Sequence, residues 1–217
     1  GYSEAFKLWR QDWLSKYIIV VPIVFIIVVW LGLKFFTYAA KVNKAASVKA
    51  GKKTYWEELL FGFHLMVHPF DGFWDLKHEK RGSVRAATTF IIITIAAFTY
   101  QSVGQSYLYN PNASYSSIII QIVSIFVPIM LWVTANWCLT TLFEGEGKFK
   151  DIYIAVGYST VPLPLFIISA TLLTHVSTAS ESGFISMLIS FGWTWVAFLV
   201  FCGMLITHDY SLFKNFI

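Results

Sequence analysis

Long apolar runs dominate the pattern along the chain, and five of them are long enough to cross a bilayer, which takes about 20 predominantly apolar residues. They cover residues 17–38, 86–107, 117–143, 152–174 and 184–207. Lys34 is the one charged residue within them, and it lies near a span end, where a lysine side chain can reach the headgroups. The pattern predicts an all-α integral membrane helical bundle with five transmembrane spans.

The polar segments between the spans predict the orientation. Cytoplasmic loops of membrane proteins carry an excess of Lys and Arg. Residues 39–85 hold nine such residues, whereas residues 108–116 and 175–183 hold none. We therefore expect residues 39–85, 144–151 and 208–217 to face the cytoplasm and residues 1–16 to lie outside.

The first 16 residues carry Lys7, Arg10 and Lys16 and resemble the basic start of a signal peptide, but no small-residue cleavage site follows. We interpret residues 17–38 as a retained anchor. The chain opens with Gly1 rather than methionine, which indicates a fragment or a processed product.

The segment between the first two spans contains a predicted helix too short to cross the membrane. Thr54 and Glu57 have the spacing of a capping box, and apolar residues then recur at helical spacing as far as Val67. We expect an amphipathic helix over residues 54–68 on the membrane surface, ended by Pro69. Residues 69–83 alternate aromatic and charged side chains, which predicts an interfacial elbow.

This elbow and the loop after the third span are the candidate partner-binding surfaces. The side chains proposed for contact are Phe70, Asp71, Phe73, Trp74, Leu76, Glu144 and Lys148. The alternative to a docking surface is an elbow that only sets the geometry of the spans. The elbow and the short helix also hold three histidines and two aspartates, but they form no recognised metal motif, so we expect no metal. The lysines from Lys41 to Lys53 set topology and attract anionic lipid.

The fourth span contains two prolines, Pro162 and Pro164, which predict a helix break near its middle. Polar groups in the spans usually pack against other helices. A broken helix can also form a transport site, and the alternative site consists of Asn136, Tyr158, Ser159, Pro162 and Pro164. Gly157–Thr160 with His175 faintly suggests an intramembrane serine protease, although the glycine expected after the serine is Thr160 here.

Composition narrows the function classes. Hydrophobic residues make up 57% and charged residues 13% of the 217 residues, against about 45–50% and about 25% in soluble domains. A soluble enzyme, a disordered tail and a nucleic-acid-binding domain are therefore disfavoured, despite the net charge of +4. Cys138 and Cys202 both lie in apolar runs, so neither a disulfide framework nor a cofactor is indicated.

Three segments together resemble the Yip family of multi-pass membrane proteins: His68–Lys77, the loop residues 144–149, and Tyr158–Pro162. The resemblance implies a four-span bundle over residues 86–207 and supplies no catalytic residues. Eukaryotic members are associated with Rab-type GTPases and vesicle traffic. The extra first span makes this chain more similar to bacterial members, which often accompany sugar-uptake ABC transporters. The resemblance therefore implies a bacterial plasma membrane as the location, with a Golgi or endoplasmic-reticulum membrane as the alternative.

We therefore expect a non-enzymatic scaffold or accessory subunit that contacts the bilayer and another membrane protein, such as ABC transporter permeases, and that binds no nucleic acid. A small-solute or lipid transporter is the alternative, and an intramembrane protease is a distant third.

Overall fold

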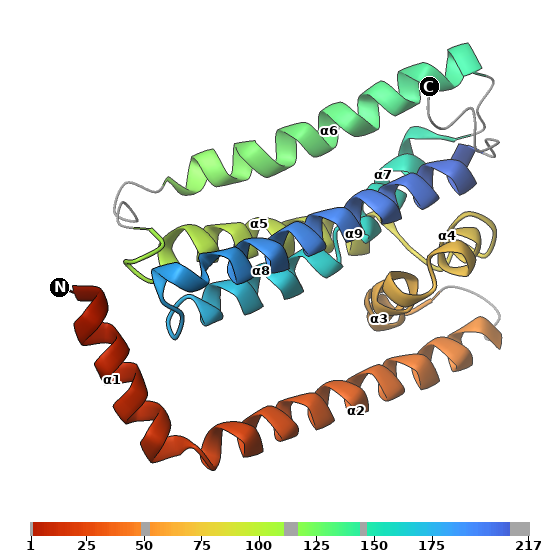
Figure 1. Cartoon of the computed structure of the whole chain (residues 1–217). Coiled ribbons are helices and arrows are strands. Elements are labelled where there is room, and N and C mark those ends of the chain that lie inside the picture. Colours follow the sequence, from red (N-terminus) through yellow and green to blue (C-terminus); the bar gives the residue numbers. More distant parts are fainter. Residues whose placement is uncertain (1, 49–52, 111–116, 144–146, 209–217) are drawn as a thin grey trace.

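The computed structural model describes residues 2–48, 53–110, 117–143 and 147–208. All regular structure in these ranges is helical. Five helical segments are long and apolar enough to span a membrane. The fold class predicted from the pattern is thereby confirmed. Figure 1 shows the helices and their order.

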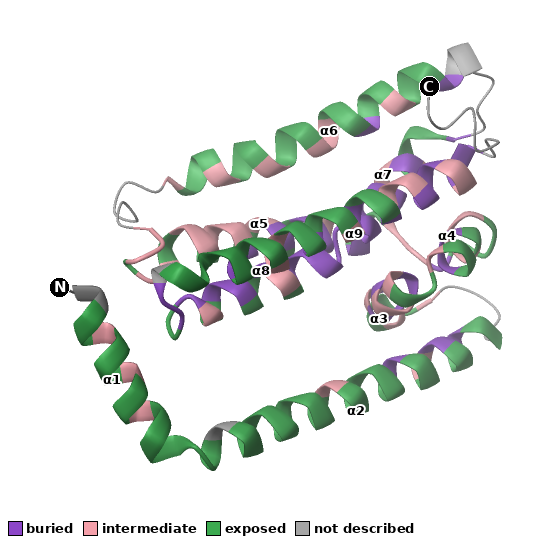
Figure 2. Cartoon of the chain, viewed as in Figure 1, coloured by how far each residue is buried: buried purple, intermediate pink, exposed green. Residues whose placement is uncertain are grey.

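The spanning helices form a core with two peripheral members. The core consists of α5 (Val84–Gly104), the pair α7 (Phe149–Ser159) and α8 (Pro162–Leu173), and α9 (Ser182–His208), which pack on one another. Helix α6 (Ile118–Phe143) packs along α5 and α7 at the edge. Within their most apolar windows, 72% of the α7–α8 residues but 6% of those in α6 are buried, so the broken span is the centre of the bundle (Figure 2).

The break in the fourth span lies where the two prolines predict it. Helix α7 ends at Ser159, and Pro162 and Pro164 occupy the first turn of α8. The first N–H groups of a helix have no partner within it, so proline is tolerated there. The Leu163 N–H donates to the Thr160 carbonyl (3.0 Å), so a backbone hydrogen bond links the two sides of the break.

The N-terminal part of the structure differs from the predicted anchor. Residues Tyr2–Tyr17 form their own helix, α1, and the span helix α2 runs from Val20 to Val48, ten residues beyond the predicted end at residue 38. The extension has a packing reason. Ala39, Asn43 and Ala46 recur at helical spacing and are buried, and this part of α2 packs against α3 (Tyr55–Val67).

The predicted surface helix is present as α3. The N–H of Thr54 donates to Oε2 of Glu57 (2.6 Å), as the capping-box pattern predicts. Within the predicted elbow, residues Pro69–His78 form a second short helix, α4, with proline at its first position. Helices α3 and α4 make a hairpin in which Gly72 approaches Leu65 so closely that a Cβ would lie 2.9 Å from the Leu65 Cα.

Two ends of the molecule can be told apart. Helices α3 and α4 lie at the end where α5 and α7 begin and α9 finishes, which we call the α3–α4 end (Figure 1). At the opposite end, the α1 end, Arg10 pairs with Glu181 (2.7 Å) and Tyr109 donates to the Thr178 carbonyl (2.8 Å). The segments around residues 10, 109 and 181 therefore lie together at this end.

Candidate functional site at the α3–α4 end

A buried glutamate joins α3 to the start of α5. Glu58 is 7% exposed, and its carboxylate accepts a hydrogen bond of 2.6 Å from the Ser83 hydroxyl. The Arg85 guanidinium lies 3.3 Å from the same carboxylate oxygen. The hydroxyl of Tyr158 donates to the Glu58 backbone carbonyl (2.8 Å), which ties α7 to the same point. Because a buried carboxylate needs such partners, this network fixes the position of α3.

A buried arginine joins the remaining elements of this end. Arg81 is 5% exposed, and it donates to Oδ2 of Asp75 on α4 (2.7 Å) and to the Asn43 carbonyl on α2 (2.7 Å). Its guanidinium lies 4.5 Å from the centre of the Phe61 ring on α3, which is a cation–π distance. One side chain thus connects α2, α3 and α4.

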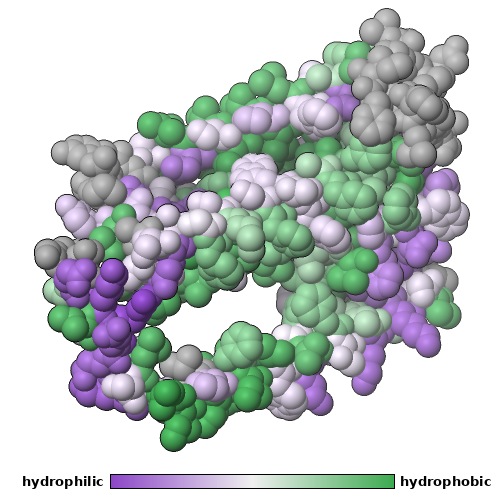
Figure 3. Space-filling model, viewed as in Figure 1, coloured by the Kyte–Doolittle hydropathy of each residue, from purple (hydrophilic) through white to green (hydrophobic). Residues whose placement is uncertain are grey.

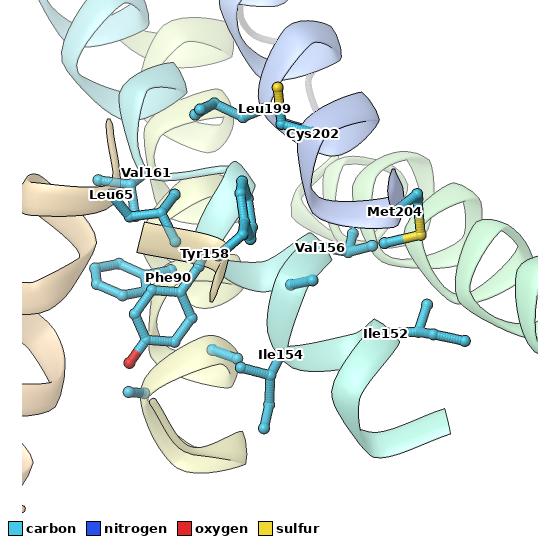
Figure 4. Close-up of a cluster of buried hydrophobic side chains, with 14 of the residues drawn as sticks. Leu65, Phe90, Ile152, Ile154, Val156, Tyr158, Val161, Leu199, Cys202 and Met204 are labelled. Carbon is cyan, nitrogen blue, oxygen red and sulfur yellow. The ribbon is translucent and has the colours of Figure 1, made fainter. Parts of the chain in front are cut away.

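An apolar core lies beneath these ionic contacts. Tyr158, Phe90 and Val161 meet the α3 residues Phe61 and Leu65 there (Figure 4). Most of these side chains are almost fully buried, and the Tyr158 ring meets Phe90 edge-on at 5.1 Å. The polar network and the core together make α3 and α4 a fixed platform rather than a loose connection.

The five elbow residues proposed for partner contact divide between two faces of α4. Phe70 and Trp74 are 57% and 51% exposed, and Asp71 is exposed with them. Phe73 is buried against Gly203 of α9, where a Cβ would lie 2.9 Å from the ring, and Leu76 packs on the core. The outward set is therefore Phe70, Asp71 and Trp74, and we call it the α4 face.

The second predicted surface adjoins α4. Lys148 is exposed and caps α7, whereas Glu144 lies outside the described residues. Asp151 of α7 and Lys77 of α4 line one small cavity, so the start of α7 lies beside α4. The structure thus brings Lys148 to the same end of the molecule as the α4 face.

The residues of the alternative transport site have separate partners. Asn136 donates to the Trp132 carbonyl of its own helix (2.9 Å), whereas Tyr158 donates to Glu58 on α3. The Ser159 hydroxyl donates to the Ala155 carbonyl (2.8 Å), and Pro162 and Pro164 are buried at the break. His175 contacts the Thr171 carbonyl through Nδ1 (3.2 Å), so the contacts of Ser159 and His175 lead to different groups.

Three histidine rings at this end stack on other rings. The His64 and His68 rings lie 4.9 Å apart, and His78 stacks on Trp74 at 4.6 Å. Burial lowers the pKa of His64, and the nearby His68 and Arg81 lower it further. In the described part of the chain, no three His, Cys, Asp or Glu side chains gather as metal ligands would.

Sequence reasoning missed the anchoring residues Glu58, Arg81 and Asn43. In the sequence, Arg81 served only as one of the basic residues that predict orientation. Glu58 lies next to the predicted apolar stripe of α3 and was given no role. A usable signal exists in the sequence: Glu58 and Arg81 flank apolar segments where an unpaired charge would be costly. Asp75 is six residues from Arg81, but Asn43 lies 38 residues from Arg81 and Ser83 lies 25 residues from Glu58, and only the tertiary structure identifies these two partners.

In the described part of the chain, the buried broken span and four further apolar spans define a multi-pass integral membrane protein. The comparison with family models extends this: the Yip1 domain matches residues 63–217. The chain therefore belongs to the Yip family, and the match covers somewhat more than the region that carries the resemblance in sequence. No curated protein and no solved structure matches the chain.

Proposed function

We propose that this Yip-family protein is a non-enzymatic membrane scaffold or accessory subunit that binds another membrane protein through the α4 face. The observation that carries the proposal is the exposure of Phe70 and Trp74 on a helix whose opposite side is fixed. Aromatic side chains supply much of the binding energy at protein interfaces. A helix already held in place by Arg81 and Phe73 loses little further entropy when a partner binds.

The proposed membrane location and partner follow from the distribution of basic residues and from membership of the Yip family. The basic residues of the segment between α2 and α5 favour a cytoplasmic α3–α4 end. The α4 face then lies at the cytoplasmic membrane boundary, within reach of a partner's interfacial helices or loops. The resemblance to bacterial members makes sugar-uptake ABC transporter permeases in a plasma membrane the first partners to examine.

The test is a comparison of variants in a pull-down of the full chain from native membranes in mild detergent. We expect a stoichiometric membrane protein with the unaltered chain, and at least about tenfold lower recovery with Trp74→Ala, which corresponds to about 1.4 kcal/mol of lost binding. Trp132→Ala is the matched control, because Trp132 is 49% exposed on α6. Equal loss with both variants would indicate general lipid or detergent effects and would refute the proposal.

The same preparation distinguishes the scaffold function from the transport alternative. On the scaffold proposal, Asn136→Ala leaves partner recovery unchanged. Solute flux in vesicles that falls with Asn136→Ala or Tyr158→Phe, while assembly stays intact, would instead support the transport alternative.

A further inference from the structure

An open space lies between α2 and the bundle. Figure 3 shows it as an opening bounded by α1, α2, the α3 region and the bundle. Residues 22–38 of α2 are exposed apart from the half-buried Gly32, and the extensive packing of α2 is against α3. The α2 wall is almost wholly apolar, with Ile23, Val24 and Ile27 about half exposed. In a membrane such a wall is covered by hydrocarbon or by another apolar surface, because water there would cost free energy.

Helices lie across both ends of this space. Helix α1 connects α2 to the bundle at one end through the Arg10 contacts with Glu181 (2.7 Å) and the Val176 carbonyl (3.3 Å). Helix α3 lies between α2 and the bundle at the other end. A transmembrane helix of a second protein has to leave the bilayer at both ends, and α1 and α3 lie across these routes. Acyl chains end within the bilayer, so the closed ends favour lipid.

A pocket with a polar end lies where α2 meets α3. It has a volume of about 180 Å³, and its lining includes Phe36, Ala40, Phe63 and His64. Phe36 belongs both to the lining of this pocket and to the exposed stretch of α2. The walls are mainly apolar, and the aromatic rings of Phe36 and Phe63 meet edge-on at 6.2 Å. Apolar walls combined with a polar end suit an amphipathic ligand.

Asn43 supplies the recognising group of this pocket. It is 4% exposed and lines the pocket, and its Nδ2 donates to the Leu60 carbonyl (3.2 Å). Its Oδ1 is buried and accepts no hydrogen bond from the described residues. Leaving a buried acceptor unpaired costs about 1–3 kcal/mol. A ligand with an N–H or O–H donor would remove that cost, and the neighbouring His64 ring offers a second polar contact.

We propose that the pocket between α2 and α3 binds the headgroup of a membrane phospholipid that carries an ammonium or hydroxyl donor, while its acyl chains occupy the space between α2 and the bundle. Phosphatidylethanolamine has such a donor. Phosphatidylcholine has the same charges but no N–H group, so it is the matched control lipid. The site is separate from the α4 face, and neither proposal requires the other.

The test counts lipids bound to the full chain. The detergent-purified protein is incubated with phosphatidylethanolamine or phosphatidylcholine of identical acyl chains, and retained lipid is counted by native mass spectrometry. We expect one retained phosphatidylethanolamine per chain and at least about tenfold weaker retention of phosphatidylcholine. Equal retention of the two lipids would overturn the proposal.

Two variants locate the site. Ala40→Phe fills the pocket from an exposed position and is expected to abolish retention, whereas Ala135→Phe on the exposed side of α6 leaves it unchanged. Circular dichroism verifies that both variants fold. Retention that survives Ala40→Phe would place the lipid elsewhere and refute the proposal. A photo-crosslinking residue in place of Leu33 that captures a polypeptide instead of lipid in native membranes would refute it as well.

Discussion

Arg81 connects three helices through one guanidinium, so its loss leaves several groups without partners. We expect Arg81→Ala to lower the free energy of unfolding by about 3–5 kcal/mol, because the Asp75 carboxylate and the Asn43 carbonyl lose a buried donor. Denaturant unfolding in micelles, followed by circular dichroism, measures the change. Lys41→Ala, at an exposed position of α2, is the control and is expected to cost less than about 0.5 kcal/mol. Equal effects of both substitutions would contradict the anchoring role.

The His64 pKa gives the α2–α3 contact a pH dependence. Because the folded-state pKa lies below 6.5, the unfolded chain takes up a proton at a higher pH than the folded chain does. The stability from neutral His64 is therefore fully present above about pH 7 and is lost as the pH falls through 6.5 toward the folded-state pKa. His68, Arg81, Asp75 and Asp71 are the charged groups that act on it.

Unfolding of the unaltered chain and of His64→Gln between pH 8 and pH 5 checks this expectation. The unaltered chain should lose more stability on acidification than the variant does. Parallel pH profiles would show that His64 titrates alike in both states and would contradict the assigned burial effect.

Residue-level burial was the least predictable feature. The elbow sequence shows Phe70, Phe73 and Trp74 as one aromatic set, and alternation with charges suggested that all face the interface. Helical periodicity separates them, since Phe73 is buried against Gly203, whereas Phe70 and Trp74 stay about half exposed. Which aromatic side chain is buried depends on contact with α9, about 130 residues further along the chain, so the local sequence pattern alone could not predict it.

At the scale of elements, Gly157 sets the distance between α5 and α7. A Cβ at this position would lie 2.7 Å from the Ala87 Cβ and 3.0 Å from its backbone. Since backbone cannot move aside cheaply, we expect Gly157→Ala to destabilise the protein by about 1–3 kcal/mol. Thermal unfolding in detergent measures it.

Gly32→Ala on α2 is the matched control for this substitution. A Cβ there meets nothing within 4 Å, so the change should be neutral or stabilise α2 by up to about 1 kcal/mol, as alanine favours helix. If Gly157→Ala behaved like Gly32→Ala, the close approach of α5 and α7 would not matter for stability.

The spans themselves could be predicted, because bilayer thickness dictates the length of an apolar helix and proline dictates where one starts or breaks. Two elements could not. The extension of α2 depends on Ala39 and Ala46 packing against α3, and α4 depends on Phe73 and Asp75 finding partners. Small and mixed-polarity segments lack a hydrophobic signal of their own, so tertiary contacts decide their structure.

For the whole molecule, the alternating basic loops predict that the α1 end and the α3–α4 end face opposite sides of the membrane. Single cysteines at Tyr107 and Lys148, in a chain with Cys138→Ser and Cys202→Ala, test this with a membrane-impermeant maleimide on intact cells. We expect labelling at position 107 without permeabilisation and at position 148 only after it. Both positions are exposed, which makes the comparison fair. Labelling of both from the same side would overturn the predicted topology.

The pairing of Arg10 with Glu181 has a consequence for how the protein is made. The two residues are 171 positions apart, and at about 5–20 residues per second a ribosome needs roughly 10 to 30 seconds to cover that distance. Helix α1 is thus synthesised well before α9 and gains its ionic partner only when the segment that precedes α9 emerges. Attachment of α1 to the bundle therefore has to wait until residues up to Glu181 have been made, and the ion pair marks a chain that has passed this point of synthesis.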